Sequence, residues 1–576
     1  MTLMCMRRIK YDATPMSYGY WNSIAKLSPD YFAIPYRGVG YDGFVSTVRT
    51  NDITNNLSGI NEWEFKPAIT FYGGNLITVS GTVRAIVYAM GGPYSSRLCT
   101  LDISDVGVVA GPLIDDVQLE LAGFDWPEIL HRSGTMYMLL AADPSYAGRL
   151  QTRTITAAGD IAAGHTDRWQ VDPDNISGLG NLLQVSGDVH AFLYRNAVTD
   201  VTRLCTVRVT AAGFITKSFV HTMTLETGPF THYHRLRHVA GTTYAIVYEI
   251  YADKVVKLHT VDIQNDGSIS HIASEVYSYP TILEVSRPDF IKYDTGQFMI
   301  VNSVRLDITC KIIEIAANGI IGSVLETTTA TGVRGRYPSV VNRTGKEFVI
   351  AHGDGNYGQV SYWGVAPVAT TQAVDNILPT SAMGHGTIVG IGEPNAIAHG
   401  FVWNTTGSPD YWDNRTDLGA VLAPGAFSDM LTGLTPVTTY YVRPYALMGD
   451  PNFGIVYGAE VSFTTPVALA TVTTDAETGL GQLIATFNGT LDDDGAEACE
   501  CGFEWGRDIT YGLTTQTESK LTGETFLQQI LGLFPSVEYH YRAFATNSAG
   551  TVFGADRPFR TKPGLGKAYA LSRSEL

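Results

Sequence analysis

A short glycine-containing turn followed by an apolar strand recurs along most of the chain, and this recurrence constrains the fold more than any other feature. The segments read SPDYFAIPY, SGTVRAIVY, SGTMYMLLA, SGDVHAFLY, AGTTYAIVY, TGQFMIVN and TGKEFVIAH. From the second segment on, the turn glycines are Gly81, Gly134, Gly187, Gly241, Gly296 and Gly345, with steps of 53, 53, 54, 55 and 49 residues. A period of this size indicates a repeat architecture.

Each repeat predicts four short strands. The first ends at the glycine turn, the second is apolar, and a variable polar loop leads to an alternating third strand such as LCTLDIS, LQTRTIT, LCTVRVT or LHTVDIQ. A second turn, such as DVG, AAG, NDG or ANG, then precedes the fourth strand. Glycine fits both turns because it readily adopts the positive φ that tight hairpins require. No segment shows helical periodicity, so the predicted fold class is all-β.

Four-stranded units of this length resemble the blades of a β-propeller. Seven units imply a seven-bladed β-propeller over residues 1–366. An open array of blades would leave an unpaired strand edge, so the N-terminal stretch LMCMRRIKY is expected to add a strand to the last blade and close the ring.

The remaining residues contain a different, twofold repeat. GLTPVTTYYVRPYA from Gly433 to Ala446 recurs as GLFPSVEYHYRAFA from Gly532 to Ala545, a shift of 99 residues. HGFVW upstream pairs with CGFEWG, and YGAEVSFTTP downstream pairs with FGADRPFRTKP. Two copies with a core tryptophan and a later tyrosine strand fit β-sandwiches.

These copies resemble fibronectin type III domains, in which a tyrosine corner precedes a strand. The matching positions are Leu434, Pro436, Thr438, Tyr440, Val442 and Ala446, then Leu533, Pro535, Tyr539, Tyr541 and Ala545. Val537 departs from the pattern, which usually has Thr or Ser one step earlier. The resemblance implies two tandem immunoglobulin-like sandwiches, at 367–466 and 467–563, followed by a C-terminal tail at 564–576.

Composition excludes several classes of function. Lys and Arg number 39 against 56 Asp and Glu, a net charge of −17, which makes nucleic acid an unfavourable partner. Neither a signal-peptide core nor an apolar run of membrane-spanning length is found, so we expect no membrane insertion. The six cysteines show no disulfide or zinc-finger spacing. They are Cys5, Cys99, Cys205, Cys310, Cys499 and Cys501.

Catalytic and metal motifs are not evident. The SxDxGxTW turn of sialidase-type propellers is missing from every unit, as are GxSxG, P-loop and HExxH patterns. His232, His234 and His238 lie at i, i+2 and i+6 of a strand, a geometry open to a metal, but an ordinary polar strand is favoured. The run LDDDG at 491–495 is interpreted as a solvated turn rather than a calcium loop. We therefore expect a non-enzyme without cofactor or metal.

A column of polar residues is the best binding signal. It lies three residues before each turn glycine, on the strand expected to line the central channel, and a ring of such groups suits a sugar or small polar ligand. The alternative is that a water-filled channel simply needs polar walls. The candidate ligand-binding residues are Lys26, Thr78, His131, Gln184, His238, Tyr293 and Asn342.

Taken together, the chain resembles a tailed-phage structural or receptor-binding protein. We expect a virion appendage, in the tail or decorating the capsid, whose propeller attaches to a host surface glycan or protein through variable loops. Its other partners would be virion proteins, in a multi-copy assembly. The alternatives are an extracellular or cell-surface adhesin, a carbohydrate-active enzyme with a propeller catalytic domain, and a passive coat component. The loops read AMGGPYSSR, ADPSYAG, RNAVTDVT, EIYADKVV and HGDGNYG.

Overall fold

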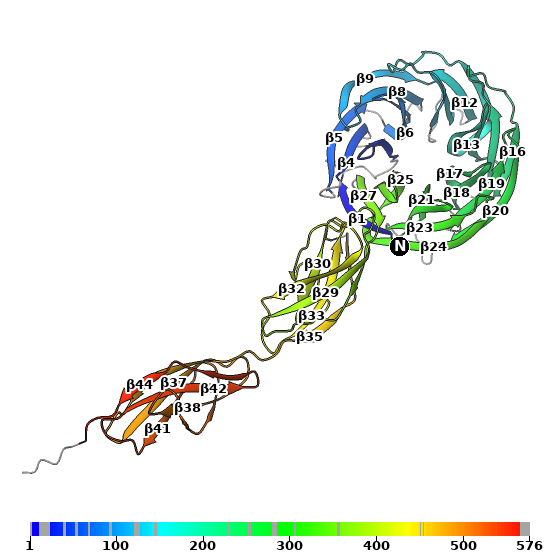
Figure 1. The fold of residues 1–576 in the computed structure, drawn as a ribbon. Coiled ribbons are helices and arrows are strands. Elements are labelled where there is room, and N and C mark those ends of the chain that lie inside the picture. Colours follow the sequence, from blue (N-terminus) through cyan, green and yellow to red (C-terminus); the bar gives the residue numbers. More distant parts are fainter. Residues whose placement is uncertain are drawn as a thin grey trace, which may run out of the picture.

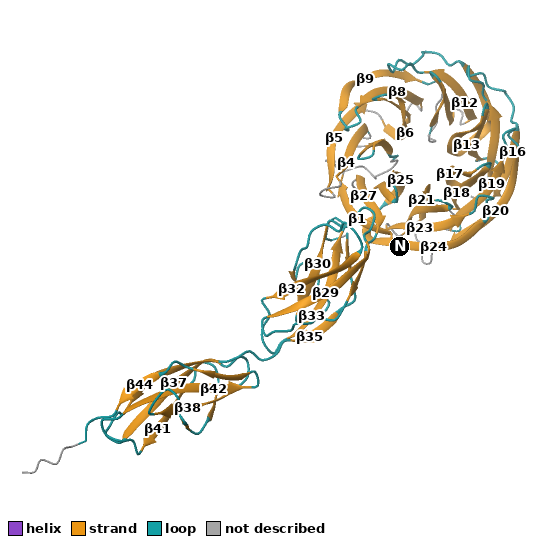
Figure 2. Ribbon diagram, viewed as in Figure 1, coloured by secondary structure: helices purple, strands orange, loops and turns teal. Residues whose placement is uncertain are grey.

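The computed structural model of the chain consists of strands, turns and loops, arranged as a ring of sheets followed by two smaller modules in a row (Figure 1). No helix occurs in its described part (Figure 2). The described residues are 3–10, 23–37, 42–51, 56–66, 70–91, 95–119, 127–142, 147–228, 231–250, 253, 255–278, 285–304, 307–353, 358–449, 451–452 and 454–564.

The ring is made of antiparallel strands in sets of four, numbered here as the first to seventh sheets. The first sheet holds β2 (Ala25–Ser28), β3 (Tyr31–Arg37), β4 (Gly43–Asn51) and β5 (Asn56–Lys66), and the second holds β6 (Thr70–Ser80), β7 (Val83–Gly91), β8 (Ser95–Ile103) and β9 (Val109–Gln118). The third holds β10 (Glu128–Ser133), β11 (Met136–Ala142), β12 (Ala147–Thr154) and β13 (Asp167–Ser186). The fourth holds β13 again, with β14 (Val189–Asn196), β15 (Val201–Arg208) and β16 (His221–Thr227). The long strand β13 thus joins the third and fourth sheets into one.

The remaining sheets of the ring follow the same order. They hold β17 (Thr231–Ala240), β18 (Thr243–Ile250), β19 (Val255–Ile263) and β20 (Ile269–Ser278); β21 (Val285–Asp294), β22 (Gln297–Val304), β23 (Asp307–Ile315) and β24 (Ile321–Arg334); and β25 (Arg336–Thr344), β26 (Glu347–Gly353), β27 (Gly358–Val365) and β1 (Leu3–Lys10). In the seventh sheet β1 pairs antiparallel with β27, from Leu3 opposite Val365 to Lys10 opposite Gln359. The N-terminal strand thus occupies the place that the sequence predicted for it.

The first strands of consecutive sheets contact one another around the centre of the ring. Each strand contacts the next in the order β6, β10, β13, β17, β21 and β25, and β25 contacts β2. A buried arginine joins the seventh sheet to the first, because Arg343 donates from Nε to Thr50 Oγ1 at 2.8 Å and pairs with Asp30.

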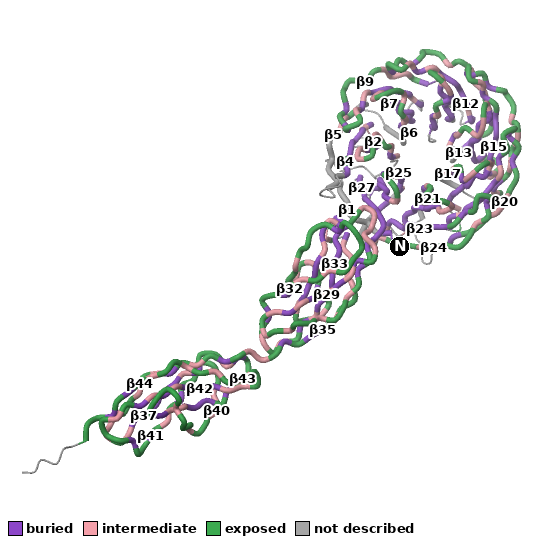
Figure 3. Tube along the Cα trace, in the orientation of Figure 1, coloured by how far each residue is buried: buried purple, intermediate pink, exposed green. Residues whose placement is uncertain are grey.

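Burial on both faces explains why the second strand of each repeat is apolar throughout. In β7, Val87 belongs to the apolar cluster that contains Leu139 of the third sheet, whereas its neighbour Ile86 belongs to the cluster that contains Ala33 of the first sheet. Successive side chains of a strand point to opposite faces, so a strand between two sheets needs apolar residues at every position. Figure 3 shows this burial concentrated in the inner strands.

A repeated threonine links each of the first five sheets to the next one. Thr206 in the third strand of the fourth sheet donates its hydroxyl to the carbonyl of Gly267, in the turn before the last strand of the fifth sheet. The same bond, 2.6 Å long, occurs five times, from the latch threonines Thr47, Thr100, Thr152, Thr206 and Thr260 to Gly107, Gly159, Gly213, Gly267 and Gly319.

The sixth sheet has Ile312 at the latch position, opposite Met299 as Thr260 is opposite Ala245. The seventh sheet offers no matching turn, because β27 continues into the next module and β1 supplies the fourth strand. Isoleucine therefore replaces the latch threonine in the sixth sheet, where the following sheet provides no turn carbonyl to accept the hydrogen bond.

Each of the two following modules has two sheets packed face to face. The first module holds β28 (Val368–Thr371), β29 (Ser381–Gly390) and β32 (Gly425–Thr432) against β31 (Asn414–Arg415), β30 (Ala398–Asn404), β33 (Thr439–Leu447), β34 (Ile455–Tyr457) and β35 (Val461–Thr464). The second holds β36 (Thr471–Thr478), β37 (Ile484–Asp493) and β41 (Thr525–Leu531) against β39 (Leu513–Thr514), β38 (Cys499–Gly506), β40 (Glu518–Lys520), β42 (Glu538–Asn547), β43 (Gly550–Phe553) and β44 (Arg557–Arg560).

The two modules share the tyrosine geometry that their sequences share. The backbone N–H of Thr435 donates to Tyr440 Oη at 3.0 Å, and that of Phe534 donates to Tyr539 Oη at 3.1 Å. Both tyrosines are buried, so each hydroxyl fixes the turn that precedes its strand.

The first module is joined to the ring by backbone pairing. Val365 at the end of β27 and Glu393 exchange two N–H···O bonds of 2.9 and 3.0 Å, and Glu393 Oε1 also accepts the backbone N–H of Lys346 at 2.8 Å. One continuous buried cluster contains Tyr362 of the ring and Ile388 of the module. The junction is therefore a packed interface rather than a bare linker.

Candidate functional site

Two ends of the ring must be distinguished. Because the strands are antiparallel, the first-to-second and third-to-fourth turns of a sheet lie at one end, as at Gly187 and Gly213 of the fourth sheet. This end is called the turn face. The second-to-third loop, residues 197–200 in the fourth sheet, lies at the other end, called the loop face.

Six of the seven predicted ring residues occupy one register position. Each pairs with the third residue after the first residue of its own turn: Lys26 with Phe32, Thr78 with Arg84, His131 with Tyr137, Gln184 with His190, His238 with Tyr244 and Asn342 with Phe348. The polar column is thus a real structural feature of the inner strands.

The seventh prediction, Tyr293, was wrong. Gly296 is the second residue of its turn, whereas Gly81 is the first of its own, so counting back from the glycine gives a position one residue too late. Tyr293 is buried and stacks on Phe348, with ring centroids 5.6 Å apart. The exposed residue that holds the register position, opposite Phe298, is Lys292.

Four of these side chains bond to their own turns. The ring nitrogens Nε2 of His131 and His238 lie 2.9 Å from the carbonyl oxygens of Gly134 and Gly241. The side-chain amides of Gln184 and Asn342 donate to Gly187 and Gly345 at 2.7 Å. Lys26 donates to the carbonyl of Arg343. The column therefore caps turns, which favours a structural role for most of its members.

The sequence analysis missed a second polar column, three residues earlier on the same strands. It comprises Ser23, Asn75, Glu128, Asn181, Arg235, Asp289 and Ser339. Several members link neighbouring inner strands: Asn75 donates to Glu128 at 2.8 Å, Asn181 accepts from Leu236 N at 3.1 Å, and Asp289 accepts from Val340 N at 2.9 Å. Extending the same repeat alignment by three positions would have found it.

This second column carries a charged cluster. Arg235 Nε lies 3.2 Å and Arg237 Nη2 lies 3.5 Å from Asp289 Oδ1. Burial raises the pKa of the Glu128 carboxyl, while the positive charges of Arg235 and Arg237 oppose that rise. The acidic side chains of Glu128 and Asp289 balance the two arginine side chains, so the cluster does not present a strong net charge.

Two pockets open between neighbouring sheets. One, of about 450 Å³, lies between the fourth and fifth sheets and brings together Gln184 and His238, two of the predicted residues, with Arg237. It is lined by Leu183, Gln184, Val185, Leu236, Arg237, His238, Gly241 and Tyr244.

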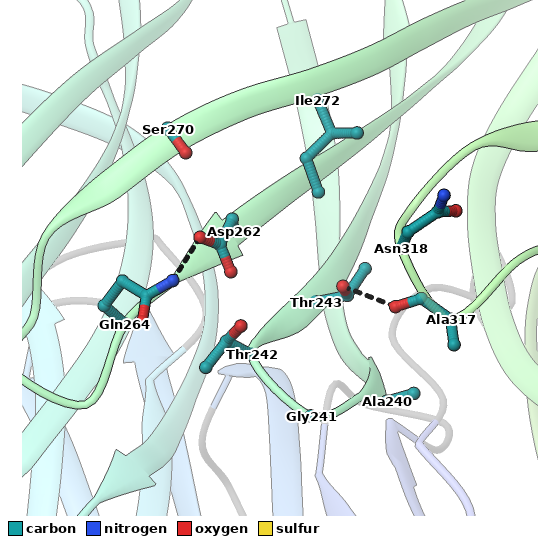
Figure 4. A pocket seen from close by; sticks show the side chains of 10 residues that line it. All are labelled: Ala240, Gly241, Thr242, Thr243, Asp262, Gln264, Ser270, Ile272, Ala317 and Asn318. Atoms are coloured by element: carbon teal, nitrogen blue, oxygen red, sulfur yellow. Dashed lines mark hydrogen bonds between the residues drawn. The ribbon is translucent and has the colours of Figure 1, made fainter.

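The other pocket, of about 520 Å³, lies on the turn face between the fifth and sixth sheets (Figure 4). It is lined by Ala240, Gly241, Thr242, Thr243, Asp262, Gln264, Ser270, Ile272, Ala317 and Asn318. None of these ten residues was predicted, because a cavity between two sheets leaves no simple pattern along one strand.

Each loop expected to carry specificity joins a second strand to a third strand, so the strand ends that flank it lie at the loop face. Residues 197–200 form a described turn in which Val198 is 67% exposed. Residues 92–94, 143–146, 251–252, 254 and 354–357 of these loops lie outside the described residues.

The described histidines of β17 lie in different surroundings. The register of β17 shifts between His232 and Arg235, and His234 is fully buried beside Tyr248, whereas His238 is exposed at its turn. Within the described residues, no group of three or more His, Cys, Asp or Glu residues could hold a metal ion.

The LDDDG run and the cysteines lie in ordinary structural surroundings. Residues 491–495 form the end of a strand and its turn, where Asp493 accepts the N–H of Gly495 at 2.9 Å. The five cysteines with described side chains are buried.

The chain matches no protein-family model, and a search of curated proteins found none similar to it. Nor do the described residues contain a helix of the length and apolar character needed to cross a lipid bilayer.

Proposed function

We propose that the chain is a virion appendage, a tail or capsid-decoration protein of the tailed-phage kind that attaches to a host surface. In this proposal residues 1–366 form a seven-bladed β-propeller, and the two modules are fibronectin type III-like spacers. Four-stranded sheets following one another around a ring support the first assignment, and the shared tyrosine geometry supports the second.

The observation that carries the proposal is the site at which the first module is attached. Glu393 bonds to Val365 and to Lys346, and both of these residues lie at the turn face of the seventh sheet. The spacers therefore leave from the side of the turns and keep the loop face unobstructed. Variable loops on a rigid scaffold are the usual place for binding residues.

The proposal assigns the two ends of the molecule different partners. The loop face binds a host surface glycan or protein, and the distal module anchors the chain to other virion proteins. Individual loop contacts are weak, so multi-copy display provides the avidity.

Selective blocking of one face tests this proposal. A Cys5→Ser background removes the one cysteine whose side chain is not described, and the remaining five are buried and protected from labelling. Val198→Cys places a thiol on the loop face, and Phe214→Cys, where the native residue is 60% exposed, places the matched control on the turn face of the same sheet. Each variant is coupled to a polyethylene glycol maleimide.

Binding of the full chain to candidate host cells and to a glycan array is then measured. We expect saturable binding that coupling at Val198→Cys reduces at least tenfold and coupling at Phe214→Cys leaves unchanged. Equal loss in both variants would contradict recognition by the loop face. Absence of binding by the uncoupled chain would favour a passive coat component.

A further inference from the structure

The turn-face pocket between the fifth and sixth sheets lies where the repeat departs from its own pattern. The pocket is separate from the loop face, so the inference drawn from it goes beyond the proposed function and does not depend on it. Figure 4 shows Asp262 and Gln264 on one side of the pocket, with Thr243, Ala317 and Asn318 on the other.

The first departure is Gln264. The equivalent residue in the second, third and fourth sheets is Ser104, Thr156 or Thr210, whose hydroxyl accepts a backbone N–H of its own turn at 2.9 to 3.0 Å. In the fifth sheet the turn is capped instead by Asp266, which accepts the N–H of Ser268 at 2.8 Å. Gln264 is thus released from capping, and its amide donates to Asp262 in the pocket.

The second departure is Thr243. The equivalent residues Val83 and Met136 pack against the turn glycine of the following sheet, at Gly159 and Gly213. Thr243 also touches its glycine, Gly319, with its methyl group, but its hydroxyl donates to the carbonyl of Ala317 at 2.8 Å. A small polar side chain therefore stands where the second, third and fourth sheets place an apolar one, Val83, Met136 or Val189.

The lining is suited to hydrogen bonding with a neutral partner. Asp262 supplies a carboxylate, Gln264 and Asn318 supply amides, and Thr242 and Ser270 supply hydroxyls. None of the ten lining residues is Lys or Arg, so an anion would find no positive charge there. Ile272, Ala240 and Ala317 add a small apolar surface for C–H groups.

We propose that this pocket binds a neutral polyhydroxylated ligand, one or two sugar units, with Asp262 and Gln264 holding its hydroxyls. A volume of about 520 Å³ lies within the range of small-molecule sites. A carboxylate beside an amide offers acceptors and donors to adjacent hydroxyls, and the small Thr243 leaves space for the ring.

Ligand-observed NMR and calorimetry on the full chain test the assignment. The probes are the methyl glycosides of glucose, galactose, mannose and N-acetylglucosamine, with glucuronate and butylammonium as the charged comparisons. Gln264→Ser restores the residue type of the second sheet at an exposed position, and Thr243→Val restores that of the second and fourth sheets. Val83→Thr makes the Thr243 exchange in reverse, between the second and third sheets, and serves as the matched control.

We expect at least one methyl glycoside to bind, and the Gln264→Ser and Thr243→Val variants each to weaken it about tenfold or more, as loss of a hydrogen-bonding partner does. Val83→Thr should bind it as the unaltered chain does, and glucuronate should bind more weakly. The assignment is overturned if no methyl glycoside binds, if butylammonium alone binds, or if neither pocket variant changes the affinity. Gln264→Ser keeps the test valid should Thr243→Val fail to fold.

Discussion

Removing one latch threonine should loosen one joint of the ring by a predictable amount. In Thr206→Val the side chain keeps its shape but loses the hydroxyl that donates to Gly267 O at 2.6 Å in a fully buried position. The carbonyl is then left without its partner, which costs about 1 to 3 kcal/mol. Thr152→Val should cost more, because the Thr152 hydroxyl also accepts the backbone N–H of Asp167 at 3.1 Å.

Position 312 offers the matched control, because Ile312 occupies the latch position where no glycine turn follows. Comparing Ile312→Thr with Ile312→Val isolates the hydroxyl from the change in volume. The Ile312→Thr variant should be less stable than the Ile312→Val variant, since its hydroxyl is buried without the turn glycine carbonyl that accepts it in the other sheets. At position 206 the order is reversed, and the unaltered chain should be more stable than the Thr206→Val variant.

Hydrogen exchange of the full chain, followed by mass spectrometry, measures both effects locally. In Thr206→Val the peptide covering 264–268 should exchange roughly 5 to 150 times faster, the factor that corresponds to about 1 to 3 kcal/mol of local opening. Peptides from the two spacer modules should not change. Unaltered exchange at 264–268, or the same order of stability at positions 206 and 312, would refute the reasoning.

Three further predictions concern pH, the spacer modules and their junction. Burial lowers the pKa of His190 and His259 to about 4, so below pH 6.5, the ordinary histidine pKa, the unfolded chain binds more protons than the folded chain. The stability due to these histidines is complete above pH 6.5 and falls towards pH 4 by up to about 3 kcal/mol per histidine. The urea midpoint of unfolding should therefore change less with pH in His259→Gln than in the unaltered chain. Tyr440→Phe and Tyr539→Phe each remove a hydroxyl that accepts a backbone N–H, and each should lower the unfolding free energy of its own module by about 1 to 2 kcal/mol in calorimetry, whereas loss in the other module would be unexpected. Glu393→Ala removes one of the three junction bonds and should widen the distance distribution between ring and spacers in small-angle scattering, an effect that Glu393→Gln should largely avoid.

The repeat alignment predicted the strands well because one physical requirement recurs in each unit. A turn with positive φ favours glycine, and a strand buried on both faces needs an apolar run, so the apolar run survives in every copy and the glycine in six of the seven. The same reliance on glycine caused the error at Tyr293, since the turn can place its glycine first or second. Counted from the first turn residue, the steps of 55 and 49 around Gly296 become 54 and 50, so the shift accounts for one residue of each step.

The candidate sites were less predictable because they depend on neighbouring sheets. Gln184 and His238 were found as polar residues in a column, and they do line one pocket. Thr243 and Gln264 look like ordinary substitutions in the sequence, and only the cavity between two sheets gives them meaning. The latch threonine was visible in LCTLDIS and its counterparts, but the carbonyl that it meets lies about 60 residues further along the chain.

The pairing of β1 with β27 means that the seventh sheet can be completed only late in synthesis. Strand β1 meets its partner only after about 350 further residues have been made. At roughly 5 to 20 residues per second, β1 waits on the order of 20 to 70 s beside an incomplete ring. Throughout that interval the growing chain carries β1 as an unpaired strand, available to any other nascent copy on the same messenger, so crowded translation should favour chains that exchange this strand.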